Sequence, residues 1–301
     1  MKQLSRRTAI RGIAAAIATA SGPHIFPQSV EVEALVKNPG IQLYTVSKEL
    51  NANVNGTLQA LRKIGYEEVE SAGFAGLSPD QFRNALGNAG IKCNSAHFLD
   101  IGEAEPEDMF EQANIVGVHY IVGSLLTKFN SKPGPDLSAD DYKRMAEFYC
   151  QLGFKAKKAG LQFAYHNHNS EFKEVDKGKI GYDLFVEETD SELVKLELDC
   201  GWMMIAGKNP VDYFRRFPNR YRMIHIKDFV KTRIPNFSRK PEAIPQSVVL
   251  GTGFIQYEPI LKAALKNGVE HFYVEQEPPF VGMTAMEAAA GDYEYLTSLS
   301  K

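Results

Sequence analysis

The sequence predicts a single (β/α)8 barrel, in which eight parallel strands are each followed by a helix. Short apolar runs typical of buried strands alternate with segments whose apolar residues recur at helical spacing, and eight such units can be counted. No GxGxxG follows the first strand and no GxxxxGK[ST] occurs, so the loops that cradle nucleotide phosphates are missing. An open doubly wound sheet is therefore the less favoured alternative.

The predicted strands are short and rich in aliphatic and aromatic residues. In chain order they are Gly40–Val46, Tyr66–Glu70, Ile91–Phe98, His119–Gly123, Leu161–His168, Val194–Asp199, Tyr221–Lys227 and His271–Gln276. The predicted helices carry an apolar stripe, and several end at a glycine. They are Val54–Ile64, Pro79–Ala89, Pro106–Val116, Ser138–Ala159, Tyr182–Thr189, Pro210–Arg216, Pro259–Lys266 and Met286–Leu299.

The N-terminus has the composition of an export signal. Residues 1–22 contain four cations and no acid, and a short apolar run with small residues after it follows the cations. The pair Arg6–Arg7 after Ser5 resembles a bacterial twin-arginine signal. We therefore expect residues 1–28 to be a twin-arginine-type signal peptide and linker, residues 29–301 to form the barrel, and the protein to be exported to the periplasm. An amphipathic N-terminal helix is the alternative.

Charge and cysteine content restrict the partners of the barrel. Without the four cations of the leader, the chain has 30 basic and 37 acidic residues, a formal net charge of −7. This balance disfavours nucleic acid as a partner, because phosphate binding needs a basic surface. The apolar run of the leader is too short to span a membrane. The three cysteines show no CxxC spacing and no disulfide framework.

Polar and titratable residues gather where the predicted strands end. In a (β/α)8 barrel these ends meet on the face that carries the chemistry. The residues are Gln42, Tyr44, Glu70, Ser95, His97, His166, His168, Glu197, Asp199, His225, Lys227, Glu275 and Glu277. Most come in pairs two residues apart, which places both members on one side of a strand. Any one of them could be an ordinary hydrogen-bonded residue, but burying so many ionisable groups together would be costly without a metal or a substrate.

The mixture of imidazoles and carboxylates predicts one bound divalent metal ion. Such ligands favour Mn²⁺, Co²⁺, Zn²⁺ or Fe²⁺ over Ca²⁺ and Mg²⁺. No cysteine is placed to contribute a thiolate. The ion would act as a Lewis acid on a carbonyl or hydroxyl group of a bound polyol.

From about Gly40 onward the chain resembles the xylose-isomerase-like TIM barrels, which include sugar phosphate isomerases/epimerases and relatives of endonuclease IV. The segments that carry the resemblance are spread over nearly the whole barrel. They are GYEEVE ending at Glu70, SAHF around His97, YHNHNSEF from Tyr165, ELDCGW around Asp199, HIKD from His225, GTGFI from Gly251 and FYVEQE around Glu275.

The resemblance implies a site residue by residue. The metal ligands would be His166, Asp199, His225 and Glu275, with His168 as the alternative on strand five, where the family has Glu. The catalytic residues would be Glu275, His166, His168 and Lys227. Substrate-binding residues would be Glu70, His97, Trp202, Tyr44 and Glu277, and the indole of Trp202 could stack on a sugar ring.

The expected function is a divalent-metal-dependent sugar isomerase or epimerase that abstracts a proton next to a carbonyl of a small-molecule carbohydrate. The missing strand-five Glu leaves a 3-keto-glycoside lyase or hydratase as an alternative, and export disfavours a phosphorylated substrate. A non-catalytic periplasmic sugar-binding protein is an alternative of another class. For the long segment 229–254 we expect a lid or a contact in a homo-oligomer, since loops of this length are usually functional or mobile. A plain solvated connection is the alternative.

Overall fold

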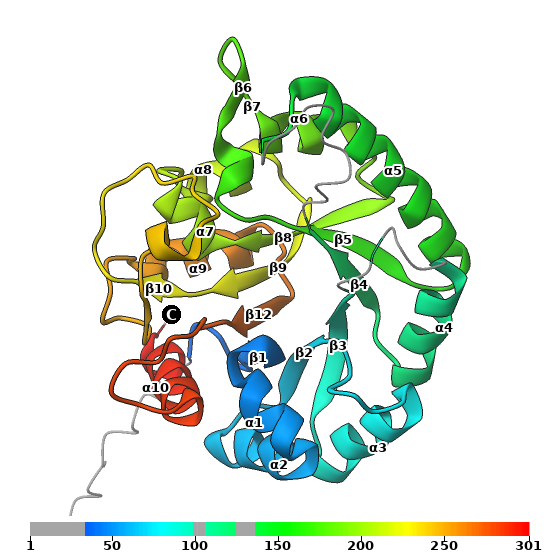
Figure 1. The fold of residues 1–301 in the computed structure, drawn as a ribbon, viewed down its shortest axis with the longest axis vertical. Coiled ribbons are helices and arrows are strands. Elements are labelled where there is room, and N and C mark those ends of the chain that lie inside the picture. Colours follow the sequence, from blue (N-terminus) through cyan, green and yellow to red (C-terminus); the bar gives the residue numbers. More distant parts are fainter. Residues whose placement is uncertain (1–33, 99–100, 102–105, 125–135, 301) are drawn as a thin grey trace, which may run out of the picture. The chain divides into compact units, whose positions relative to one another are not determined.

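Eight parallel strands close into a barrel in the computed structural model, which describes residues 34–98, 101, 106–124 and 136–300 (Figure 1). Around the barrel the order is β1, β2, β3, β4, β5, β8, β9 and β12, and β1 pairs with both β2 and β12. The strands are β1 Gly40–Gln42, β2 Glu68–Ala72, β3 Lys92–His97, β4 Tyr120–Gly123, β5 Gln162–His166, β8 Val194–Asp199, β9 Tyr221–Ile226 and β12 His271–Val274. The predicted (β/α)8 barrel is confirmed.

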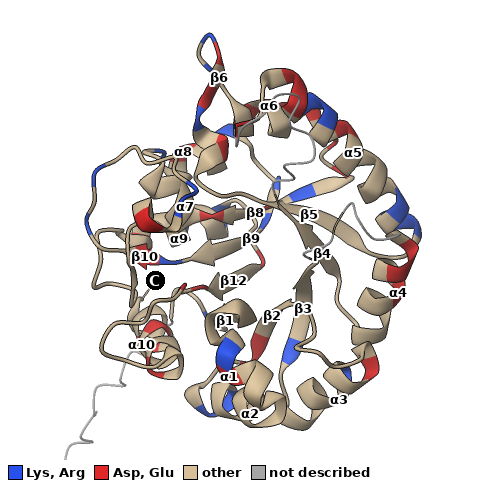
Figure 2. Cartoon of the chain, in the orientation of Figure 1, with Lys and Arg blue, Asp and Glu red and all other residues tan. Residues whose placement is uncertain are grey.

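Helices form a ring outside the strands (Figure 1). They are α2 Val54–Ile64, α3 Pro79–Ala89, α4 Pro106–Val116, α5 Ala139–Lys158, α6 Gly181–Glu188, α8 Pro210–Arg216, α9 Tyr257–Lys266 and α10 Ala285–Ser298. Figure 2 shows Lys, Arg, Asp and Glu along these outer helices, with both signs interspersed. None of the described helices is long and apolar enough to cross a membrane.

The predicted first strand is too long. It ends at Gln42, because the Gln42 side chain accepts a hydrogen bond from the Tyr44 backbone N–H (3.1 Å) and turns the chain into the 3-10 helix η1, Leu43–Val46. The short helix α1, Ser47–Ala52, follows. Tyr44 therefore lies on a helical turn, and the prediction that it ends strand one is wrong.

A second short helix begins directly at the end of β8. Asp199 caps α7, Cys200–Ile205, since its Oδ1 accepts a hydrogen bond from the Trp202 backbone N–H (2.7 Å). Two small hairpins also project from the loops. They are β6 Glu174–Asp176 with β7 Lys179–Ile180, and β10 Asp228–Phe229 with β11 Ser247–Val248.

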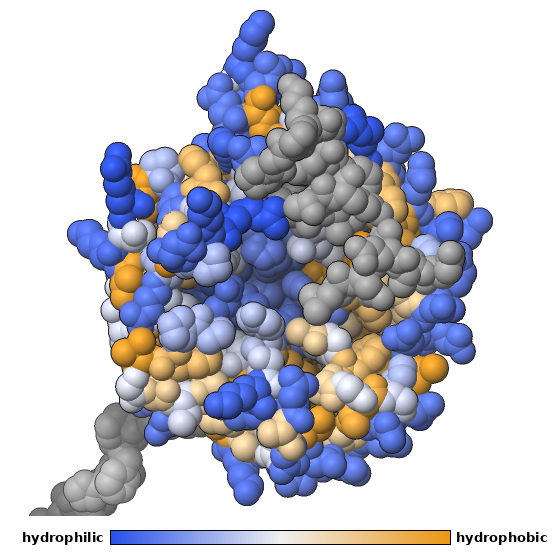
Figure 3. Space-filling view, viewed as in Figure 1, coloured by the Kyte–Doolittle hydropathy of each residue, from blue (hydrophilic) through white to orange (hydrophobic). Residues whose placement is uncertain are grey.

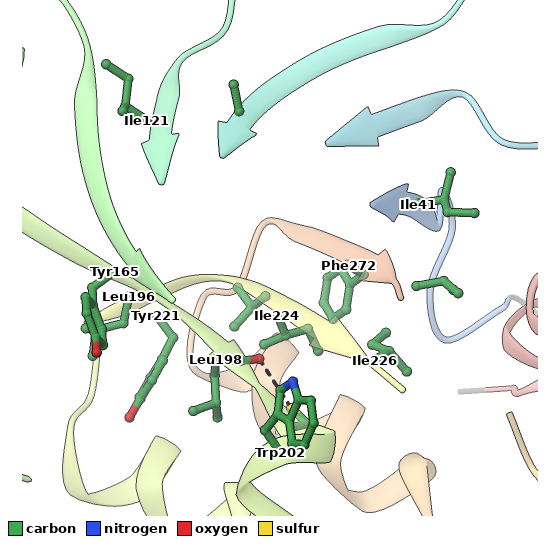
Figure 4. Packing of buried hydrophobic residues seen from close by; sticks show 14 of the residues in the cluster. Ile41, Ile121, Tyr165, Leu196, Leu198, Trp202, Tyr221, Ile224, Ile226 and Phe272 are labelled. Atoms are coloured by element: carbon green, nitrogen blue, oxygen red, sulfur yellow. Dashed lines mark hydrogen bonds between the residues drawn. The ribbon is translucent and has the colours of Figure 1, made fainter. Parts of the chain in front are cut away.

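The alternation of side chains along the strands separates two environments. Residues such as Leu196, Leu198, Ile224 and Ile226 belong to the large apolar core in which strands and helices pack together (Figure 4). A smaller apolar cluster, which includes Ala164, Met223 and Tyr273, contains alternate residues of these strands. Two residues further along β5, β9 and β12 stand His166, His225 and Glu275. Because residues at i and i+2 share a face of a strand, the apolar cluster supports a layer of titratable residues.

The long segment after β9 is fixed at several points. The Asp228 carboxylate accepts hydrogen bonds from the backbone N–H groups of Phe229, Gly251, Gly253 and Ile255 (2.9–3.2 Å). A Cβ on Gly253 would lie 2.2 Å from Asp228 Oδ1, so glycine is required there. Near the middle of the segment, the Asn169 side chain donates to the carbonyls of Asn236 (3.1 Å) and Ser238 (3.0 Å). The segment is thereby anchored to the loop after β5.

The leader predicted at residues 1–28 lies outside the described residues, as does the boundary at residue 29. Both stay predictions. The homo-oligomer also stays a prediction.

A buried acid on α10 gives a stability prediction. Asp292 accepts a hydrogen bond from the Leu250 backbone N–H (2.7 Å), while its Oδ2 has no hydrogen-bond partner among the described residues. Burial raises the pKa of Asp292 to about 7. The unfolded chain releases this proton near the ordinary Asp pKa of about 3.9, so Asp292 lowers stability as the pH rises from about 4 to 7.

Asp292→Asn is therefore expected to raise the melting temperature by several degrees at pH 8, with little change at pH 4. Thermal unfolding followed by circular dichroism at both pH values measures this. Asp176→Asn, a change at an exposed aspartate, is the matched control and should shift neither value. A variant that is no more stable than the unaltered protein at pH 8 would contradict the prediction.

Candidate active site

The titratable side chains predicted at the strand ends converge at the carboxyl end of the barrel. Cross-strand register places His166 beside Glu197 and Asp199 beside His225. Glu275 follows β12, and its backbone N–H donates to the Ile226 carbonyl (3.1 Å). All five of these residues are buried. The parallel barrel thus brings together residues that are far apart in the sequence.

Four of these side chains lie close together, and three of them, Asp199, His225 and Glu275, place their ligand atoms within 4.8 Å of one another. His225 Nδ1 lies 3.1 Å from Glu275 Oε2 and 3.9 Å from Asp199 Oδ2, and His166 Nε2 also lies 3.9 Å from Asp199 Oδ2. Asp199, His225 and Glu275 can therefore reach one cation at the ligand distances of about 2.0–2.2 Å found for His and carboxylate groups. His166 belongs to a second group, with His97, Glu197 and His225, that adjoins the first through His225. Of the two histidines predicted on strand five, His166 is the one that approaches Asp199.

The other nitrogen of each imidazole contacts a buried glutamate. His225 Nε2 lies 2.6 Å from Glu70 Oε2, and His166 Nδ1 lies 3.0 Å from Glu197 Oε2. Histidines that bind metals usually have such a carboxylate partner, which fixes the orientation of the ring and increases its basicity. Both imidazoles are therefore held with their other nitrogen, His166 Nε2 or His225 Nδ1, facing Asp199 Oδ2.

Unpaired buried oxygens indicate that a cation fits here. Among the described residues, Glu197 Oε1 and Asp199 Oδ2 are buried without a hydrogen-bond partner. Asp199 Oδ2 lies 3.0 Å from Lys227 Nζ, an ion-pair contact without hydrogen-bond geometry. Lys227 Nζ also lies 2.5 Å from Glu275 Oε2 and 2.6 Å from Glu277 Oε1. One ammonium group shared by three carboxylates leaves an excess of negative charge, which favours a divalent cation.

The pKa values reflect this charge distribution. Burial raises the pKa of Asp199 to about 7, Glu275 adds to the effect and Lys227 opposes it. Burial and the nearby His225 hold the pKa of His166 well below its usual range, so its ring is neutral, as a metal ligand must be. Burial opposes the charge on His225, but the carboxylates of Glu197, Glu275 and Glu70 outweigh burial and raise its pKa.

A cavity of about 220 Å³ opens beside this cluster. It is lined by Gln42, Tyr44, Ala72, His97, Ser124, His166, His168, Glu275 and Glu277. Figure 3 shows a hydrophilic centre on this face of the barrel. The sequence-predicted residues His97, Tyr44 and Glu277 thus line the same cavity as two of the four clustered residues.

Two residues predicted to bind substrate do not line this cavity. Glu70 lies behind it, where it accepts hydrogen bonds from the Gln42 amide (2.8 Å) and the Ser95 hydroxyl (2.5 Å). Trp202, in the first turn of α7, packs in the apolar core and is only 3% exposed, and Lys227 Nζ stands 4.9 Å from its ring centre. The geometry therefore offers Trp202 as a support for Lys227 rather than as a surface on which a sugar stacks.

His168 stands just beyond β5 and faces the cavity. Its backbone N–H donates to Glu171 Oε1 (2.8 Å), but its ring nitrogens have no hydrogen-bond partner among the described residues. Burial lowers the pKa of His168, which keeps the ring neutral. A neutral, unpartnered imidazole at a cavity wall is suited to accept a proton from a bound molecule.

Glu197 is the residue that the site assignment missed. Its Oε2 contacts both His166 Nδ1 (3.0 Å) and His97 Nε2 (2.8 Å), so it joins two histidines from different strands. The sequence did indicate Glu197, because it stands two residues before Asp199 and therefore shares its face of the strand.

His97 carries a raised pKa in this environment. The carboxylates of Glu70 and Glu197 outweigh burial and raise the pKa of His97 to about 10.

Comparison with known proteins finds the same fold in several solved structures. Solved structures with the same fold include a sugar phosphate isomerase/epimerase from Parabacteroides distasonis, with a TM-score of 0.70, 24% identity, and coverage of 90% of this chain and 96% of that one. The IolI protein with a bound zinc atom has a TM-score of 0.67 and 18% identity, over 87% of this chain and 98% of that one.

Among curated proteins, an inosose dehydratase from Clostridium perfringens is 29% identical over 155 residues, which are 47% of this chain and 50% of the relative. The chain thus spans about half the length of this relative. The family model described as xylose isomerase-like TIM barrel matches residues 58–298, which is most of the barrel. The chain therefore belongs to the xylose isomerase-like TIM barrel family.

Proposed function

We propose that this protein is a divalent-metal-dependent enzyme that removes a proton next to the carbonyl of a small carbohydrate and then eliminates water. The observation that carries the proposal is the position of the His168 ring, which lines the cavity together with the proposed ligands His166 and Glu275. The name inosose dehydratase of the curated relative supports elimination as the outcome.

The residues divide into three roles. His166, Asp199, His225 and Glu275 would hold the cation, with Mn²⁺, Co²⁺ or Zn²⁺ as the preferred ions for this ligand set. The bound ion would supply a Lewis acid that polarises the carbonyl of the substrate. His168 accepts the proton from the neighbouring carbon, and His97 and Glu277 bind hydroxyl groups at the cavity wall.

Elimination also needs a proton for the departing hydroxyl. His168 and Lys227 follow β5 and β9, which flank β8 in the barrel. The C–H bond breaks as its proton passes to His168, and its electron pair becomes the new C=C bond. The C–O bond on the next carbon breaks, and the hydroxyl leaves as water. Its proton comes from the buried Lys227 ammonium through Glu277, which lines the cavity and lies 2.6 Å from Lys227 Nζ.

The strand-five histidine favours this reaction over a symmetric isomerisation. With His166 in place of a glutamate, the four proposed ligands include no second glutamate to exchange a proton with Glu275 across the substrate. Return of the proton by His168 to the same or the neighbouring carbon would make the protein an epimerase or isomerase. Elimination, epimerisation and isomerisation share the step of proton removal, so the same site could perform any of the three.

NMR in D2O tests the proposal. The metal-loaded protein is incubated separately with free, phosphorylated and 3-keto sugars, and the products are examined for deuterium and for a new C=C bond. We expect deuterium exchange next to the carbonyl together with loss of a hydroxyl group. Deuterium exchange without loss of a hydroxyl group would identify an isomerase or epimerase. Sugar binding without deuterium exchange would identify a sugar-binding protein and contradict the proposal.

We also propose that residues 1–28 direct export, which would make an unphosphorylated carbohydrate the substrate. The support is the pair Arg6–Arg7 ahead of a short apolar run. Changing both arginines to lysine should keep the full chain inside the cytoplasm, as measured by fractionation of cells that express each form. Equal amounts of both forms in the periplasm would contradict the proposal.

A further inference from the structure

A second cavity of about 330 Å³ lies beside the first at the same end of the barrel. It is formed by the start of α1 and by the segment that connects β12 to α10 (Figure 1). Its lining residues are Tyr44, Thr45, Ser47, Lys48, Glu49, Pro278, Phe280, Met283, Thr284 and Ala285.

The two cavities adjoin each other at Tyr44. Tyr44 lines both cavities. On the other wall Glu277 lines the first cavity and the next residue, Pro278, lines the second. The Gln276 backbone N–H donates to the Thr45 hydroxyl (3.0 Å), which ties these walls together. A group attached to a molecule in the first cavity would therefore pass Tyr44 to enter the second.

The chemistry of the two cavities differs. The first is lined by histidines and carboxylates. In the second, Pro278, Phe280, Met283 and Ala285 form an apolar wall, and Ser47, Lys48 and Glu49 form a polar wall. The Tyr44 side chain, 46% exposed, stands at the junction. In Figure 3 the hydrophilic centre gives way to apolar colours on the side of α10. An aromatic ring and a thioether are suited to pack against a flat apolar or aromatic group.

We propose that the second cavity binds an apolar or aromatic substituent of the carbohydrate, so that the substrate is a glycoside rather than a free sugar. This inference rests on the proposed function, because it places the sugar ring in the first cavity. The polar cavity then binds the reacting ring, and the apolar wall of the second cavity selects among substituents. Tyr44 contacts both parts of such a molecule.

Calorimetric titration of the full chain tests the inference with two ligands that differ only in the substituent, phenyl β-D-glucoside and methyl β-D-glucoside. We expect the phenyl compound to bind about tenfold more tightly, as partial burial of an aromatic ring provides. Met283→Ser, a change at a lining residue that is 38% exposed, should reduce this ratio to about twofold. Val281→Ser is the matched control, because Val281 is 61% exposed and is not a lining residue, and it should leave the ratio unchanged.

Equal affinity for both glucosides, or no binding of either, would overturn the inference. A preference for the phenyl compound that survives in Met283→Ser, with its fold verified by circular dichroism, would also overturn it. The deuterium-exchange experiment separates this result from the proposed function. A protein that prefers the phenyl compound but exchanges no proton with any sugar keeps the second cavity as a binding site and loses the proposed reaction.

Discussion

Asp199→Asn is expected to weaken divalent-metal binding by at least about 100-fold and to abolish sugar turnover with it. Changes to groups that only orient a ligand typically cost about 10- to 100-fold in affinity, and Asp199 is placed as a ligand itself. The amide can still accept the hydrogen bond from the Trp202 backbone N–H that caps α7. The fold is therefore retained while one negative charge is lost beside His225 and Glu275.

Metal content after dialysis against buffered Mn²⁺ or Zn²⁺ measures the effect, and thermal unfolding gives a second readout. Ligands that bind only the folded state stabilise it, by about 2.7 kcal/mol at 100 times the dissociation constant, so a chelator should lower the melting temperature of the unaltered protein and not of Asp199→Asn.

Glu68→Gln is the control. The Glu68 carboxylate, at the start of β2, accepts hydrogen bonds from the Tyr273 hydroxyl (2.6 Å) and the Asn94 amide (2.9 Å). Its substitution should therefore not affect metal content. Full metal content in Asp199→Asn would contradict the site.

His168→Asn is expected to slow deuterium exchange next to the carbonyl by about 10²- to 10⁴-fold, the usual contribution of a general base. Metal content should stay unchanged, because His168 lies outside the group formed by His166, Asp199, His225 and Glu275. His166→Asn should lower both quantities. This contrast separates a base that acts on the substrate from a metal ligand that stands two residues away.

The rate of deuterium exchange under saturating metal measures the effect of His168→Asn. His119→Asn is the matched control, since His119 is an exposed histidine just before β4, at the opposite end of the barrel. An unchanged exchange rate in His168→Asn would assign the base to another residue, with Glu275 the next to test.

Most of the site was predictable because two simple rules act together. A period of two places alternate residues on one face of a strand, and a parallel barrel brings all carboxyl ends to one rim. These rules placed His166, Asp199, His225 and Glu275 among the residues at the strand ends, and the family resemblance singled them out as expected ligands. The same rules also indicate Glu197, which stands two residues before Asp199 and so shares its face of the strand.

Residues just beyond the strands were predicted less well, because local hydrogen bonds decide their direction. The Gln42 side chain turns the chain at Leu43, so the apolar pattern that continues through Val46 belongs to a 3-10 turn. The Asp199 cap starts α7 at once and carries the Trp202 ring into the interior. Neither hydrogen bond has a signature in residue spacing, because each depends on a side chain reaching backbone N–H groups in the folded chain.

The anchoring of the segment after β9 has a consequence for how such a barrel can diversify. Asn169 fixes this segment at Asn236 and Ser238, and Asp228 together with the β10–β11 pair fixes it again from Ser247 onward. Between these anchors lies the arc of residues 239–246. Because closing a loop of doubled length costs only about 0.6 kcal/mol more, this arc can gain residues without moving Lys227. Variation in this arc would change which molecules reach the carboxyl end of the barrel, while the proposed metal ligands and His168 keep their positions.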